Sequence, residues 1–441
     1  MKKGTKNRFI CLALAVLLLC GGFFAVPFSI GEPVYAADEE DEFRAVWVAT
    51  VFALNYPSKM TADPEKLKAD ALKILDNCQE MGFNTVILQV RPASDSFYDS
   101  DIFPWSMYLT GTQGKAPAGG FDPLEFWIEE AHKRGIELHA WLNPYRITAT
   151  KGDEKKLTAD HPALLHPEWT VLHTDGKLYW DPGHPEAQKL ILAGVEEIVD
   201  NYDVDGIQID DYFYPDTAFN DMNTYLTYGG GFADVKVWRF HNTEYMVRSI
   251  HEIVKTAGGG MTFGVSPVGI WANKSSSNPL GSNTRGSEAY AKYADTRGWV
   301  KKGIMDYIAP QIYWEFGYSL ADYETLANWW MDVAKDTGVD LHISLAAYRA
   351  CNANPDSPWY GTSQIQKQVE WNRQHEEIKG YSMYSYAIFD TETEMQELMK
   401  ELNGSAEQPS VDKPPVPLDR KEFLWILGNT VLQRAEKALS R

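Results

Sequence analysis

The sequence predicts an α/β protein built as a (β/α)8 TIM barrel with loop insertions, and three observations support this prediction. Eight short apolar segments, rich in β-branched and aromatic residues, recur along the chain. Helical patterns separate many of them, beginning at pairs such as Asp63-Pro64 and ending at glycines such as Gly82. Their total span of about 360 residues is long for most domains but normal for a barrel with long loops.

The predicted strands and helices alternate, which is typical of a closed parallel sheet. The strands cover residues 44–49, 85–90, 137–142, 206–209, 261–266, 306–313, 342–346 and 381–386. The clearest helices cover 63–81, 124–134, 185–201 and 238–257. In such a barrel, residues that follow the strands converge on one face, where barrel enzymes carry their reactive groups.

Residues 1–36 are predicted to be a secretory signal peptide. Four basic residues come first, an apolar run covers residues 9–24, and Val34-Tyr35-Ala36 offers small residues for cleavage before Ala37. A retained membrane anchor is the alternative. Because no second apolar run is long enough to span a bilayer, the remainder is expected to be exported, either secreted or associated with the cell envelope.

The barrel domain is predicted to cover residues 40–403, and two short segments follow it. Residues 404–419 indicate a linker, because they are polar and carry four prolines (Pro409, Pro414, Pro415 and Pro417). Residues 420–441 have the pattern of a short amphipathic helix. The pattern identifies no partner for this helix and leaves the oligomeric state open.

The net charge indicates which partners the protein avoids, and the positions of the cysteines indicate whether they form a disulfide. The net charge is −20, and it becomes −23 once the four basic residues and one acidic residue of the signal are removed. Such a surface repels nucleic acids and anionic lipids, so neither is an expected partner. Cys78 and Cys351 are predicted at opposite ends of the barrel, too far apart for a disulfide, and both are expected to be free thiols.

The most informative segment is Asp205–Pro215. It contains the fourth predicted strand, which is followed directly by Asp210-Asp211-Tyr212. Two carboxyl groups across one bond are the usual requirement of glycoside hydrolysis, and aromatic rings suit the apolar faces of sugars. Asp210 is the first candidate for a catalytic carboxylate. Asp211 either shares that role, orients Asp210 or binds a sugar hydroxyl. The structural alternative is that both aspartates cap a helix or close a loop.

Seven motifs, taken together and in order, resemble the glycosyl-hydrolase-like family 10 proteins of bacterial cell envelopes over almost all of residues 43–400. This resemblance implies a TIM barrel that cleaves glycans, and peptide-free peptidoglycan strands are one substrate that it suggests. The motifs are Phe43-Arg44-Ala45-Val46-Trp47-Val48-Ala49-Thr50, Gln89-Val90-Arg91-Pro92-Ala93-Ser94-Asp95, Trp141-Leu142-Asn143-Pro144-Tyr145-Arg146, Asp181-Pro182-Gly183, Asp210-Asp211-Tyr212, Gly264-Val265-Ser266-Pro267 and Pro310-Gln311-Ile312-Tyr313-Trp314.

The fourth strand also allows a comparison with family 18 chitinases, whose motif is Asp-Gly-x-Asp-x-Asp-x-Glu. Asp205, Gly206 and Asp210 fit that motif, but Gln208 replaces its middle aspartate and Tyr212 replaces its acidic glutamate. The proton donor must therefore be Asp211 or come from elsewhere. The departure also keeps a second function open, a non-catalytic glycan-binding barrel.

Other residues that follow strands complete the predicted site. Asp95 and Glu315 are the candidates for a partner acid, Asp95 from its motif and Glu315 because apolar surroundings beside Trp314 would raise its pKa. Arg91 and Arg146 either hold the carboxylates through paired hydrogen bonds or bind an acidic sugar substituent. Asn143 either contacts a sugar hydroxyl or fixes a loop. The predicted substrate-binding residues are Arg91, Asn143, Tyr145, Arg146, Tyr212, Asn273, Tyr313, Trp314 and Tyr348.

Cofactor and metal chemistry are not predicted. The chain has no His-Glu-x-x-His spacing, no Gly-x-Ser-x-Gly elbow and no glycine-rich phosphate loop after a strand. A hydrolase of another bond, such as a deacetylase, is disfavoured by the lack of metal-ligand spacing. Among the tryptophans near strand ends, half are expected in the core and the others as stacking platforms (Trp47, Trp105, Trp141, Trp180, Trp271 and Trp314).

Overall fold

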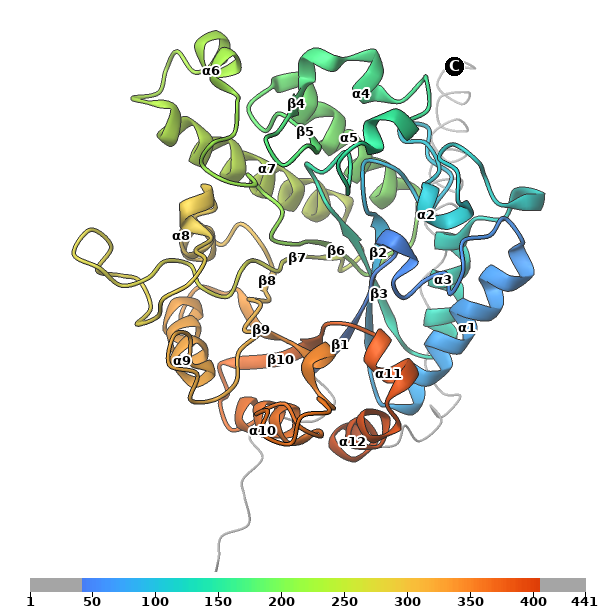
Figure 1. The fold of residues 1–441 in the computed structure, drawn as a ribbon, viewed down its shortest axis with the longest axis vertical. Coiled ribbons are helices and arrows are strands. Elements are labelled where there is room, and N and C mark those ends of the chain that lie inside the picture. Colours follow the sequence, from blue (N-terminus) through green and yellow to red (C-terminus); the bar gives the residue numbers. More distant parts are fainter. Residues whose placement is uncertain (1–41, 405–441) are drawn as a thin grey trace, which may run out of the picture. The chain divides into compact units, whose positions relative to one another are not determined.

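The computed structural model describes residues 42–404 of the chain. The predicted signal peptide, the proline-rich linker and the predicted C-terminal helix lie outside the described residues. Eight parallel strands form a closed barrel in the order β1-β10-β9-β8-β7-β6-β3-β2, and β1 also pairs with β2. Figure 1 shows these strands at the centre with the helices arranged around them. The predicted fold class is confirmed.

Most of the predicted elements lie within a few residues of their expected positions. The barrel strands are β1 (Phe43–Val48), β2 (Thr85–Arg91), β3 (Glu137–Leu142), β6 (Gly206–Ile209), β7 (Thr262–Val265), β8 (Tyr307–Ile308), β9 (Asp340–Leu345) and β10 (Ile378–Met383). The main outer helices are α1 (Pro64–Glu80), α3 (Pro123–Lys133), α5 (Pro185–Asn201), α7 (Val235–Ala257), α8 (Thr296–Lys302), α9 (Tyr323–Ala334), α10 (Ser363–Asn372) and α12 (Thr393–Asn403).

Local sequence explains where several helices begin. Asp63 and Asp122 precede Pro64 and Pro123, and each aspartate accepts a hydrogen bond from a backbone N–H in the first turn. Proline suits this position because its missing N–H would have no partner within the helix. His184, just before Pro185, accepts a hydrogen bond from a backbone N–H in the first turn of α5 through a ring nitrogen. The helix start predicted from Asp63-Pro64 is therefore confirmed, and α3 and α5 begin within one residue of their predicted starts.

The sixth predicted strand is the largest departure from the expected boundaries. Residues 306–313 were expected to be one strand, but β8 contains only Tyr307 and Ile308. Pro310 lacks the N–H that a longer ladder would use. Beyond it, Gln311 forms isolated bridges to Val268 and Ser344, so the backbone continues beside its neighbours without regular pairing.

The long connections were predicted only as insertions, and the structure shows what they contain. Between β3 and α5 the chain forms α4 (Pro162–Leu165) and a small antiparallel sheet of β4 (Thr170–Leu172) and β5 (Leu178–Trp180). Between β6 and α7 it forms α6 (Met222–Tyr228). These elements lie together at the top of Figure 1, above the barrel strands in that view. Both insertions follow strands that end at the predicted site.

A bulge in β2 changes which side chains face the barrel interior. Gln89 pairs with Trp141 of β3, but the next β3 residue, Leu142, pairs with Arg91, so Val90 is an extra residue. Residues two apart on a strand normally share a face. The extra residue places the side chains of Gln89 and Arg91 on opposite faces. Gln89 enters the barrel, while Arg91 lies outside it, against α5.

The lower barrel interior holds large rings because small residues face them. A Cβ on Gly264 would lie 1.9 Å from Cζ of Tyr307, and a Cβ on Gly206 would lie 2.8 Å from His139. The Tyr307 hydroxyl donates to Gln208 Oε1 (2.9 Å) and lies 2.8 Å from His139 Nδ1. His342 stacks on Phe43 with ring centroids 4.0 Å apart. The glycine of the Asp205-Gly206 motif thus makes room for a ring.

Both cysteines in residues 42–404 are free, as predicted: Cys78 is buried in α1 and Cys351 is partly exposed. None of the helices in residues 42–404 is long and apolar enough to cross a membrane.

Replacing Gly264 with alanine is expected to destabilise the barrel. The new methyl group would overlap the Tyr307 ring, and overpacking of this kind costs roughly 1–3 kcal/mol. Chemical denaturation of the wild type and the Gly264→Ala variant measures the difference. Gly231→Ala is the matched control, because no atom lies within 4 Å of its added Cβ. Equal stability of Gly264→Ala and wild type would contradict this packing.

His342 is expected to make the fold sensitive to acid. Burial lowers the pKa of its ring from 6.5 to about 3, and the charge of His139 adds to this effect. Between those pH values the unfolded chain binds a proton that the folded chain does not, so stability falls as pH falls. From pH 7 to pH 5 the loss is roughly 2 kcal/mol. His342→Asn should lose less stability over this interval in urea titrations; an identical loss would contradict the assignment.

Candidate active site

The Asp210 carboxylate is held at the end of β6 by three hydrogen-bond donors. Trp141 Nε1 donates to Asp210 Oδ2 (2.9 Å), Asn143 Nδ2 donates to the same oxygen, and the Tyr212 backbone N–H donates to Oδ1 (3.3 Å). Only 3% of Asp210 is exposed. Trp141 and Asn143 are two apart at the end of β3, so both face the interior beside Asp210.

Asn143 is the centre of this network. Its Oδ1 accepts hydrogen bonds from Gln89 Nε2 (3.2 Å) and from Arg146 Nη2. Because an arginine can only donate, the oxygen of the amide must face Arg146 and its NH₂ must face Asp210. Gln89 Oε1 in turn accepts from the backbone N–H groups of Thr50 and Val51 (3.0 Å each). These contacts are of the kind that one of the two roles predicted for Asn143, fixing a loop, requires.

Arg146 supplies a buried positive charge behind the carboxylates. Its Nε donates to the Pro92 carbonyl (2.8 Å), and its guanidinium lies 4.7 Å from the centroid of the Tyr212 ring. The charge lowers the pKa of Asp210 and, less strongly, that of Asp211. Arg146 is 7% exposed and its partners are protein groups. This position of Arg146 is the one required by one of its two predicted roles, holding the carboxylates.

The two adjacent aspartates point in different directions. Gln311 Nε2 donates to Asp211 Oδ1 (3.3 Å) and to the Ser266 carbonyl (3.0 Å), so Asp211 leans toward the ends of β7 and β8. Asp210 leans toward β3. Burial raises the pKa of both carboxyls, and for Asp210 the negative charge of Asp211 contributes next, which brings its pKa to about 7. Both carboxyls are therefore harder to ionise than a carboxyl in water.

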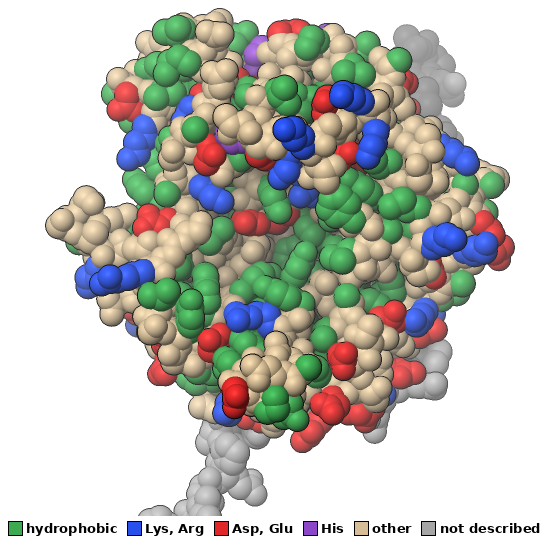
Figure 2. All heavy atoms as spheres, in the orientation of Figure 1, with side chains coloured by type: hydrophobic (Ala, Val, Ile, Leu, Met, Phe, Trp, Pro, Cys, Tyr) green, Lys and Arg blue, Asp and Glu red, His purple; other side chains and the backbone are tan. Residues whose placement is uncertain are grey.

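Aromatic rings form a continuous wall beside Asp210. Trp47 meets Trp141 edge to face with centroids 4.9 Å apart, and Tyr384 lies 6.1 Å from Trp47. Tyr313 stacks on Tyr384 at 6.1 Å. Tyr348, which is 52% exposed, completes the wall with edge contacts to Tyr313 and Tyr384 at 6.0 and 6.2 Å. Figure 2 shows a hollow at the centre of the molecule with acidic and hydrophobic side chains along it.

The two predicted partner acids lie in other surroundings. Asp95 is fully buried, its Oδ1 accepts from the Ala93 N–H (3.0 Å), and burial raises its pKa to about 6. Glu315 Oε2 accepts from Trp359 Nε1 (2.9 Å) and lies 3.6 Å from Arg349 Nη1. Asp95 thus contacts its own loop, and Glu315 contacts residues that follow β9, rather than the carboxylate of Asp210.

Three predicted substrate-binding residues are placed away from the hollow. Arg91 is 2% exposed and covers Phe103 on the outer side of β2, because the bulge reverses its direction. Tyr145 is 1% exposed and packs in the hydrophobic core. Asn273 uses its amide to hold its own loop, donating to Glu288 and the Gly286 carbonyl and accepting from the Gly286 N–H.

The tryptophans divide between the site and the shell around it. Trp47 and Trp141 face the interior near Asp210. Trp180 and Trp271 are buried, while Trp105 and Trp314 are partly buried against the core. Trp314 therefore packs on the barrel and is absent from the ring contacts of the aromatic wall.

Three residues of the site were not among the predicted candidates: Gln89, Gln311 and Tyr384. Each lies near or just after the end of a strand, so the rule that strand ends converge pointed to their positions. Their residue types gave no separate signal, because an amide or a phenol ring does not by itself indicate a catalytic role.

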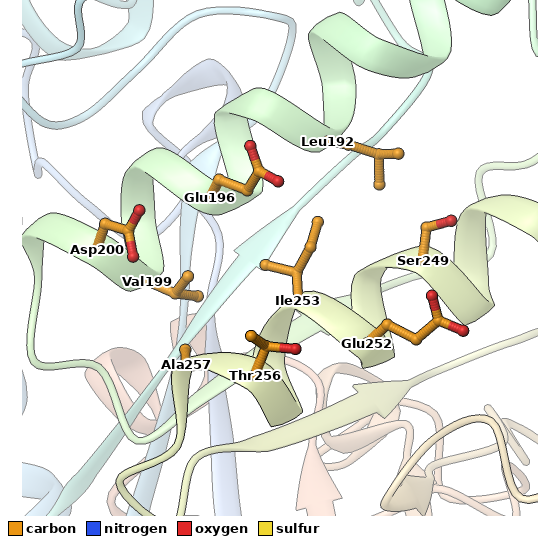
Figure 3. A pocket seen from close by; sticks show the side chains of 9 residues that line it. All are labelled: Leu192, Glu196, Val199, Asp200, Ser249, Glu252, Ile253, Thr256 and Ala257. Carbon is orange, nitrogen blue, oxygen red and sulfur yellow. The ribbon is translucent and has the colours of Figure 1, made fainter.

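A separate cavity of about 450 Å³ lies on the outside of the barrel between α5 and α7 (Figure 3). Its walls carry Glu196, Asp200 and Glu252 together with Leu192 and Ile253. None of the candidate site residues lines it. No group of three or more His, Cys, Asp or Glu in the described part of the chain is arranged to hold a metal ion.

Removing the charge of Arg146 is expected to raise the pKa of Asp210. The guanidinium stabilises the ionised carboxylate, so Arg146→Met should shift the titration upward by about 1 unit or more, a typical effect of a nearby opposite charge. Carbon-detected NMR of the labelled carboxyl measures it. Arg248→Met on α7, which removes an arginine paired with Glu244, is the control. An unchanged or lowered pKa would contradict this electrostatic role.

Comparison with known proteins identifies relatives of the whole barrel. Glycosyl hydrolase YngK from Bacillus subtilis (strain 168) is 44% identical over 378 residues, which cover 84% of this chain and 72% of the relative. Glycosyl hydrolase DigH from Escherichia coli (strain K12) is 39% identical over 414 residues, which cover 87% of this chain and 93% of the relative.

Solved structures share the fold at much lower identity. The glycoside hydrolase domain of PgaB (BpsB) from Bordetella bronchiseptica matches with a TM-score of 0.53 and 14% identity, covering 83% of this chain and 100% of that one. The family model described as Glycosyl hydrolase-like 10 matches residues 42–361 of the chain. With that match and the two bacterial relatives, the chain belongs to the glycosyl hydrolase-like family 10.

Proposed function

We propose that the protein is an exported glycoside hydrolase that cleaves a polysaccharide of the bacterial envelope or the environment. The observation that carries this proposal is the Asp210–Asp211 pair, two carboxyls with raised pKa beside a continuous wall of aromatic rings. Acids at strand ends and rings for sugar stacking are the two parts that this chemistry needs. The relatives named glycosyl hydrolases support the same reading.

The surroundings of the two carboxyls support different proposed roles. Burial, and then the charge of Asp211, raise the pKa of Asp210 to about 7. Asp210 is therefore the proposed general acid, which protonates the departing oxygen of the glycosidic bond. Asp211 is the proposed ionised partner, which acts on the opposite side of the scissile bond as base or nucleophile. Activity should then decline as pH rises through the pKa of Asp210.

The contacts of Arg91 and Arg146 bear on whether the substrate carries an acidic group. Arg91 lies outside the barrel, and Arg146 already binds the Asn143 amide and the Pro92 carbonyl. These contacts favour a structural role for both arginines over reading an acidic sugar substituent. The aromatic wall of Tyr313, Tyr348 and Tyr384 instead favours recognition through the apolar faces of sugar rings. Peptide-free glycan strands of peptidoglycan remain a proposed substrate, together with neutral polysaccharides.

The proposed location follows from the amino-terminal sequence. Residues 1–36 carry the basic start, apolar run and cleavage pattern of a secretory signal. Export would place the enzyme beside envelope polysaccharides, either in solution or attached to the cell surface.

Direct incubation with candidate substrates tests the activity. Purified peptide-free glycan strands, chitin oligomers and plain β-glucans are digested separately, and the products are identified by mass spectrometry. Cleavage products from at least one of these polymers support the proposal. Intact polymers in every digest, together with measurable binding, would favour the non-catalytic glycan-binding barrel. That alternative draws on the burial of Asp210 and on Tyr212 at the position of the chitinase acid.

Asp210→Asn is expected to lower kcat at least 10²-fold, the lower range for loss of a general acid or base. The amide retains the shape of the side chain, so the thermal melting curve should change little. If Asp210 is the acid, the variant retains more activity on substrates with good leaving groups, whose departure needs no proton. Asp211→Asn should lose activity on good and poor leaving groups alike. Near-wild-type kcat in Asp210→Asn would remove it from the mechanism.

A further inference from the structure

Tyr384 follows the last barrel strand, β10, and its ring is fixed from several sides. It lies between Trp47 and Tyr313, with centroids 6.1 Å from each, and Tyr348 meets it edge on at 6.2 Å. Its backbone N–H donates to the Leu345 carbonyl (2.9 Å), and its carbonyl accepts from the Tyr348 N–H (3.1 Å). A ring held by both backbone and packing has little freedom to move.

The Tyr384 hydroxyl, unlike that of Tyr313, makes no hydrogen bond to another described residue. The Tyr313 hydroxyl lies 3.3 Å from Ser344 Oγ, and the Tyr381 hydroxyl, earlier on the same strand, donates to Asn403 Oδ1 (2.5 Å). Tyr384 is only partly buried, so its hydroxyl is open to an incoming ligand. A donor left without a protein partner at a site of this kind is suited to the substrate.

Several observations connect Tyr384 with the carboxylate of Asp210. Trp47 touches both Tyr384 and Trp141, and Trp141 donates directly to Asp210. The charges of Asp210 and Asp211 also act on Tyr384 and, after burial, help to raise its pKa to about 12. The hydroxyl therefore remains protonated at physiological pH and can donate a hydrogen bond.

We infer that Tyr384 is a catalytic residue whose hydroxyl donates a hydrogen bond to the reacting sugar beside Asp210. This inference deepens the proposed function and rests on it. A fixed donor aimed at the reacting group needs no reorganisation when charge develops in the transition state. The ring of Tyr384 belongs to the aromatic wall, but its hydroxyl acts on the chemical step.

Tyr384→Phe tests this inference because it removes the hydroxyl and leaves the ring contacts. We expect kcat to fall about 10- to 100-fold, somewhat less than for loss of a charged oxyanion donor, while KM changes less than about threefold. The fall of activity at alkaline pH should keep its midpoint, because Asp210 sets it. Tyr381→Phe is the matched control: the same change on the same strand, at a hydroxyl that binds Asn403. Its kcat should remain within about twofold of wild type.

Three outcomes would overturn the inference. A higher KM with unchanged kcat would show that Tyr384 only binds substrate, and a displaced alkaline midpoint would show that it acts through the carboxylates. An equal loss in Tyr381→Phe, with a matching drop in melting temperature, would show a structural effect. Failure of the proposed function is distinguishable, because the wild type would then cleave none of the polymers and Asp210→Asn would change nothing.

Discussion

The hydrogen bonds around the Asn143 amide are the interaction on which the site depends. One side chain joins the carboxylate of Asp210, the guanidinium of Arg146 and the amide of Gln89, and through Gln89 it reaches the backbone after β1. The ends of four neighbouring strands are thereby tied to one another. A buried polar network of this kind is favourable only when every member is satisfied, so each residue type is specified by the others.

The same network sets the charge of the site. Burial and the charge of Asp211 raise the pKa of Asp210, whereas the charge of Arg146 and the donors from Trp141 and Tyr212 stabilise its ionised form. The balance brings the pKa of Asp210 to about 7. A carboxyl with such a pKa is suited to proton transfer near neutral pH.

The barrel interior is divided into two levels with different tasks. In the lower level, Tyr307 and His139 fill the space that Gly264 and Gly206 leave open, and the Tyr307 hydroxyl joins His139 and Gln208 through hydrogen bonds. His342 stacks on Phe43 beside them. In the upper level, Trp47, Trp141 and Tyr384 line the hollow beside Asp210. Rigid packing below holds the rings above in place, and the bulge in β2 decides that Gln89 rather than Arg91 joins them.

The sequence by itself determined the barrel, most of its strands and the position of Asp210, Asp211 and Tyr212, because periodicity and helix caps are local properties. It also led to Arg146 and Asn143, whose motif follows β3. Only the tertiary structure decided their roles and partners. Arg91 turns outward because a single extra residue in β2 reverses a strand face. Glu315 binds Arg349 and Trp359, which are distant in sequence, and Tyr384 lies against Trp47 only because the barrel closes β10 onto β1. Contacts between residues far apart in the chain leave no local pattern in the sequence. The set of residues that forms the site could therefore be identified only from the closed barrel.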